Sequence, residues 1–135
     1  MDFLNVDLEL EGPKNLAPLV RALGDVYVLH ITSEAPFVAN LELGSEPEPG
    51  RSVASDAALL EARVRSLLAL VEGLDEPARE LWDACTKRSF NVGLQSGLAP
   101  AYTQYALPSS LLQRLGAVGA ELVVTLYGAR YQEAT

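Results

Sequence analysis

Three carboxylates alternate with valine and leucine near the start of the chain, at Asp7, Glu9 and Glu11. Successive residues of a strand point to opposite faces and rise about 3.4 Å each, so these side chains stand about 7 Å apart on one face. Such an acidic row (Asp7, Glu9, Glu11) can bind a basic protein, because binding relieves the repulsion within the row. It can also bind a divalent cation weakly, although its spacing matches no calcium-binding loop.

A later segment extends this acidic row. Residues 37–43 again alternate apolar with polar, and their polar positions include Asn40 and Glu42. A carboxylate patch forms if these side chains share a face with the row. The connection that follows, Gly44–Gly50, has no apolar residue and carries two further acids. The candidate partner-binding residues are therefore Asp7, Glu9, Glu11, Glu42, Glu46 and Glu48. The alternative is a solvated sheet face whose charge prevents aggregation.

The sequence offers little else that is chemically reactive. It contains one histidine, His30, and one cysteine, Cys85, so no histidine–cysteine metal cluster can form within one chain. The run Gly93–Gly97 lacks the spacing and the lysine of a phosphate-binding loop. We therefore predict no enzymatic activity, no cofactor and no metal. We expect His30 to lie on the same strand row as Val26 and Val28, and Cys85 to be a small buried hydrophobic residue.

Charge and composition narrow the class of protein. The net charge is −8, and residues 1–50 hold nine acidic and two basic residues, which gives −7 for this part alone. An acidic field repels phosphate backbones and so disfavours nucleic-acid binding. The N-terminus lacks the basic and apolar regions of a signal peptide, and no apolar run approaches the roughly 20 residues of a membrane helix. With a single cysteine, these features predict a cytoplasmic protein.

The hydrophobic pattern predicts one α+β domain over residues 1–135. Strand, helix, glycine and strand signals near the N-terminus return near the C-terminus, which predicts a pseudo-repeat of 3–43 and 89–128. A helical hairpin over 54–88 joins the two halves. The expected order is βαββ–αα–ββαβ, including a fifth strand at 102–107. The simplest architecture is a largely antiparallel sheet with helices packed on one face.

The pattern resembles a bacterial family of small α+β proteins, domain of unknown function family 4279. The resemblance depends on the opening strand Asn5-Val6-Asp7-Leu8, on Leu23-Gly24 after the first helix, and on the closing Leu111–Gly116 with Leu122–Tyr127. The chain departs from the family by lacking a lysine-glycine element after the first helix. The resemblance implies a setting among bacterial immunity or defence proteins.

These observations give one leading hypothesis and two alternatives. The leading hypothesis is a non-enzymatic protein that binds a basic partner, such as a toxin, through the acidic residues. The first alternative is a homo-oligomer, such as a homodimer, in which acidity serves solubility only. The second is a small-molecule pocket lined by Tyr27, His30, Tyr102 and Tyr105.

Overall fold

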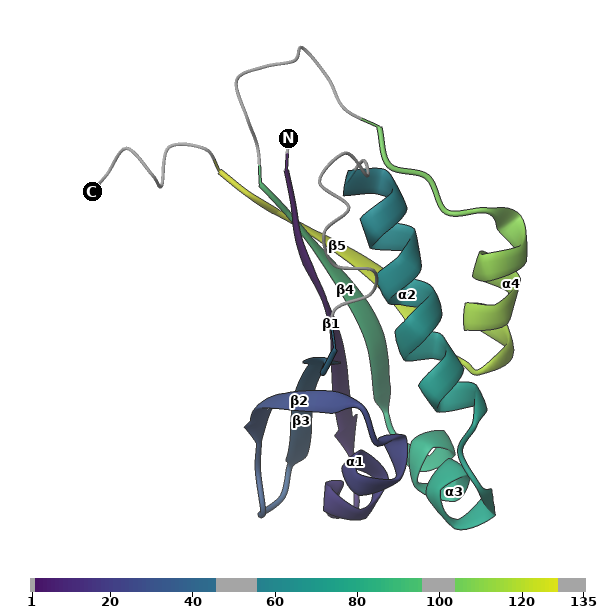
Figure 1. Ribbon diagram of the computed structural model, residues 1–135. Coiled ribbons are helices and arrows are strands. Elements are labelled where there is room, and N and C mark those ends of the chain that lie inside the picture. Colours follow the sequence, from purple (N-terminus) through teal and green to yellow (C-terminus); the bar gives the residue numbers. More distant parts are fainter. Residues whose placement is uncertain (1, 46–55, 96–103, 129–135) are drawn as a thin grey trace.

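The chain folds into a single sheet with helices on one side. The computed structural model describes residues 2–45, 56–95 and 104–128. In chain order the elements are β1 (Asp2–Gly12), α1 (Ala17–Leu23), β2 (Val26–Ile31), β3 (Phe37–Leu43), α2 (Asp56–Glu72), α3 (Glu76–Ala84), β4 (Lys87–Gln95), α4 (Ser109–Ala117) and β5 (Glu121–Tyr127). Figure 1 shows α2 and α4 along one face of the sheet, with α1 and α3 at one end. None of the helices that the structure describes lies over the opposite face, and we call it the open face.

The five strands form one sheet in the order β2-β3-β1-β4-β5. The pairs β2–β3, β3–β1 and β1–β4 are antiparallel, whereas β4–β5 is parallel. Parallel neighbours need a crossover connection, which α4 provides between β4 and β5. β1 is therefore the central strand although it comes first in the chain.

The core lies between the sheet and α2. β1 directs Val6, Leu8 and Leu10 toward the helices, and all three are at most 2% exposed. Across β1, Leu8 stands opposite Leu41 on one side and Phe90 on the other. The apolar stripe of α2 covers them with four residues that are at most 1% exposed, namely Val64, Leu67, Leu68 and Val71. Burial of this single apolar face is the main stabilising contribution.

Local signals define where the short helices begin and end. The Asn15 side chain accepts a hydrogen bond from Ala17 N at 2.8 Å at the start of α1, and Gly24 ends that helix with a φ of +88°. Asp75 caps α3 by accepting from Ala78 N at 3.2 Å. On α3, the Trp82 indole donates to Val118 O at 2.8 Å, which joins this helix to the end of α4.

The predicted fold class is confirmed: the protein is α+β with a mostly antiparallel sheet and helices on one face. The predicted order fits roughly, with one difference. Residues 104–107 are not a strand, and residues 102 and 103 of that prediction lie outside the described residues. Tyr105 and Leu107 pack partly buried against the core, so the segment alternates like a strand without pairing with one.

Arg88, near the start of β4, connects several backbone groups. Its guanidinium donates to the backbone oxygens of Trp82, Asp83, Cys85 and Gly119, with the shortest bond, to Cys85 O, at 2.7 Å. Arg88 therefore fixes the joint between α3 and β4 and the turn that leads into β5.

Candidate functional site

The open face collects the carboxylates that the sequence singles out. Asp7, Glu9 and Glu11 lie on β1 opposite Glu42, Asn40 and Val38 of β3, and directly opposite residues of a sheet share a face. The predicted patch of Glu42 and Asn40 beside the acidic row is thus present. Glu121 joins it from β5, because it stands opposite Ser89, which stands opposite Glu9.

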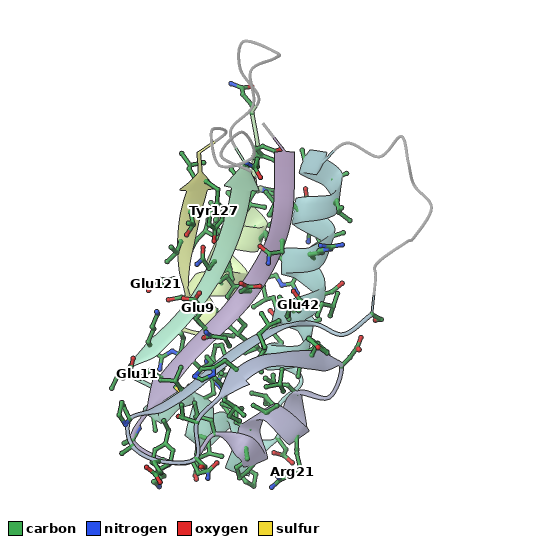
Figure 2. The ribbon with its side chains drawn as sticks, turned by 90° about the vertical axis from the view of Figure 1, so that its left-hand side faces the viewer. Glu9, Glu11, Arg21, Glu42, Glu121 and Tyr127 are labelled. Carbon is green, nitrogen blue, oxygen red and sulfur yellow. The ribbon has the colours of Figure 1, made fainter. Side chains whose placement is uncertain are left out.

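We call these five carboxylates the acidic face: Asp7, Glu9, Glu11, Glu42 and Glu121. Figure 2 shows four of them, labelled Glu9, Glu11, Glu42 and Glu121, spread over the strands of the open face. Glu46 and Glu48 lie outside the described residues. Sequence reasoning missed Glu121 because no local signal places β5 next to β4.

One part of the acidic face is neutralised. Lys87 Nζ lies 3.2 Å from Glu9 Oε1 in an ion pair. Asn91 donates to Glu9 Oε2 at 3.1 Å, and Thr125 donates to Asn91 Oδ1 at 2.9 Å. This chain of contacts runs from β1 across β4 to β5 and holds the Glu9 carboxylate in one orientation.

Asp7 is in a different situation. Its only side-chain hydrogen bond among the described residues comes from Asn5 Nδ2, at 3.1 Å. The strand pairing puts it directly opposite Glu42. Partial burial, then the negative charge of Glu42 and then that of Glu9 raise the pKa of Asp7 to about 6. Like charges directly opposite in a sheet destabilise it, so the pair of Asp7 and Glu42 opposes folding when both side chains are ionised.

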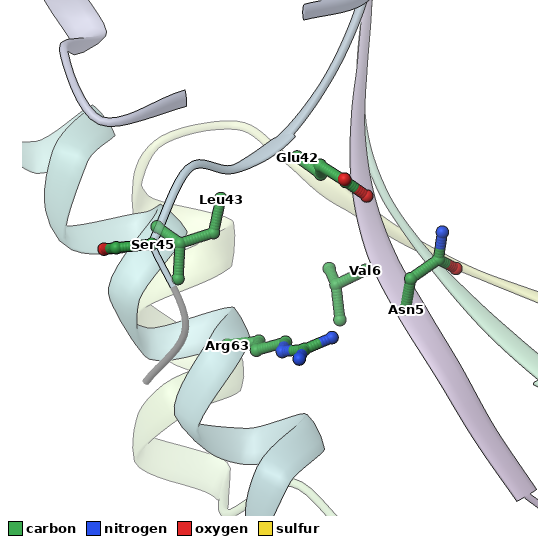
Figure 3. A pocket seen from close by; sticks show the side chains of 6 residues that line it. All are labelled: Asn5, Val6, Glu42, Leu43, Ser45 and Arg63. Atoms are coloured by element: carbon green, nitrogen blue, oxygen red, sulfur yellow. The ribbon is translucent and has the colours of Figure 1, made fainter. Parts of the chain in front are cut away.

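A shallow hollow borders this point. Asn5, Val6 and Glu42 line it together with Leu43, Ser45 and Arg63. Figure 3 shows Arg63 reaching it from α2, beneath the strands that carry Asn5 and Glu42. The hollow has a volume of about 50 Å³. Drug-sized ligands occupy pockets of about 300–1,000 Å³, so this hollow admits only a few waters.

Of the four residues of the predicted small-molecule pocket, Tyr27 and Tyr105 lie on different sides of the sheet. Tyr27 is 61% exposed on β2. Tyr105 packs against the core among the helices, whereas Tyr27 stands opposite Glu42 on the open face. Tyr102 lies outside the described residues.

The predicted row of Val26, Val28 and His30 is wrong. A bulge between Val28 and His30 shifts the register, so that Val28 stands opposite Leu41 and His30 opposite Asn40. Since Leu41 is buried beneath the helices and Asn40 lies on the open face, His30 lies on the open face, beside the acidic face. No sequence signal marks this bulge.

Cys85 is buried, as predicted. Burial raises the pKa of its thiol, and the nearby Arg88 offsets this only in part. Since the thiolate is the reactive form, this burial disfavours Cys85 as a nucleophile. Among the described residues, no group of three or more histidine, cysteine, aspartate or glutamate side chains is placed to hold a metal ion. No helix in the same part of the chain is long and apolar enough to cross a membrane.

Comparison with known proteins gives no relative. No protein-family model matches the chain, and neither the curated proteins nor the solved structures contain a match. The resemblance to domain of unknown function family 4279 therefore stays a prediction. What the structure defines is a class of architecture, an α+β domain with one helix-covered face and one open, acidic face.

Proposed function

We propose that this protein is a non-enzymatic binding module whose acidic face engages a protein with a lysine- or arginine-rich surface. The observation that carries the proposal is the position of Asp7. It is half-buried on the open face, opposite Glu42 and near Glu9, and its pKa is raised to about 6 by partial burial first and then by these two negative charges. A cation placed there by a partner removes the repulsion that the free protein retains.

The arrangement also favours a protein partner over a bound ion. The carboxylates are spread over three strands, β1, β3 and β5, and Glu9 is already paired with Lys87. A flat, extended set of charges of this kind matches a surface of similar extent. Charge complementarity across such a surface mainly accelerates association and selects the partner. Binding should therefore weaken as the salt concentration rises.

The experiment is affinity capture from a lysate of the cells that make the protein, with three baits. The first bait is the wild type. The second is Asp7→Asn/Glu42→Gln, which removes the two opposed charges. The third, Glu34→Gln/Glu80→Gln, removes two exposed charges elsewhere and so has the same net charge as the second. A captured partner is then purified, and its affinity for each bait is measured by calorimetry.

We expect a basic protein to bind the wild type and the third bait equally, and to bind the second bait about tenfold more weakly, a loss of about 1.4 kcal/mol. Binding at pH 6 should also release protons, because a nearby cation lowers the pKa of Asp7 from about 6. A partner that binds all three baits equally would show that the acidic face is not the binding surface.

A further inference from the structure

We draw no further inference here: the strongest candidate, the strip of exposed apolar side chains that Leu122, Val124 and Leu126 form on the helix-covered face of the edge strand β5, carries none, because nothing in the part of the chain that the structure describes shows what covers it.

Discussion

Replacing Asp7 by asparagine should stabilise the protein near neutral pH, although it removes a side chain that accepts a hydrogen bond. Asparagine keeps an Oδ1 oxygen, so the bond from Asn5 Nδ2 to that atom can persist. What the substitution removes is the negative charge opposite Glu42. We therefore expect a gain in the free energy of unfolding that depends on pH.

The size of the gain follows from the shift in pKa. Asp7 moves from an ordinary value of 3.8 to about 6, or about two units. One unit corresponds to about 1.4 kcal/mol, so the full shift would correspond to about 3 kcal/mol against the ionised form. Asp7 is only half-buried, and water and salt screen the interaction, so we expect about 1 kcal/mol.

The sign follows from which state binds the proton. Between about pH 4 and pH 6 the folded wild type binds the Asp7 proton more tightly than the unfolded chain, so wild-type stability falls as the pH rises through this window. Asparagine does not titrate. The advantage of Asp7→Asn over the wild type should therefore be small below pH 4 and reach its full value above about pH 6.5.

Urea denaturation at pH 4 and pH 7.5, each at 20 mM and 500 mM NaCl, measures this difference. At pH 7.5 we expect a gap of about 1 kcal/mol at low salt and a smaller one at high salt, because salt screens the repulsion by Glu42 and Glu9 but not the effect of burial. At pH 4 we expect little or no gap. Glu34→Gln, at an exposed turn position, serves as the control and should show no such dependence. An advantage of the same size at both pH values, or a loss of stability at pH 7.5, would refute the assignment of repulsion to Asp7.

Three further substitutions test other parts of the structure by urea denaturation. Trp82→Phe removes the indole donor and leaves a buried carbonyl unpaired, which should cost about 1–3 kcal/mol; no loss would mean that the bond is not formed. Leu8→Ala in the fully buried central strand should cost about 2–5 kcal/mol, whereas Leu122→Ala, at a position that is 39% exposed, should cost far less; equal losses would contradict the difference in burial. Glu72→Gln should destabilise slightly at pH 7 and not at low pH, because the hydrogen bond from Arg114 lowers the pKa of Glu72; its pH dependence should be opposite to that of Asp7→Asn.

The acidic row was predictable because β1 alternates without interruption. Glu9, for example, is flanked by Leu8 and Leu10, which are at most 1% exposed, and its own side chain lies on the open face. The same rule places Glu42 on β3. Alternation predicts the face of the strand on which a residue lies. Whether residues of two strands form one patch depends also on which strands pair and in which register.

Other features could not be read from the sequence, because they depend on pairing between distant segments. The parallel position of β5 beside β4, which brings Glu121 near Ser89, follows from the crossover through α4. The predicted strand at 102–107 has the right alternation in its described part, since Tyr105 is partly buried between exposed neighbours. Alternation of buried and exposed residues indicates an extended segment. The segment becomes a strand only if its backbone can hydrogen-bond to the edge of a sheet.

The central position of β1 has a consequence for the nascent chain. β1 is synthesised first, yet Gln95, the last residue of its neighbour β4, follows Gly12 by 83 residues. At about 5–20 residues per second, the ribosome needs roughly 4 to 17 s to complete that neighbour. During this time β1 lacks one of its two neighbouring strands, β4, so its valine and leucine side chains are only partly covered. We expect the alternating carboxylates to protect this newly made strand, since charges within an apolar strand keep it from associating with other unfinished chains.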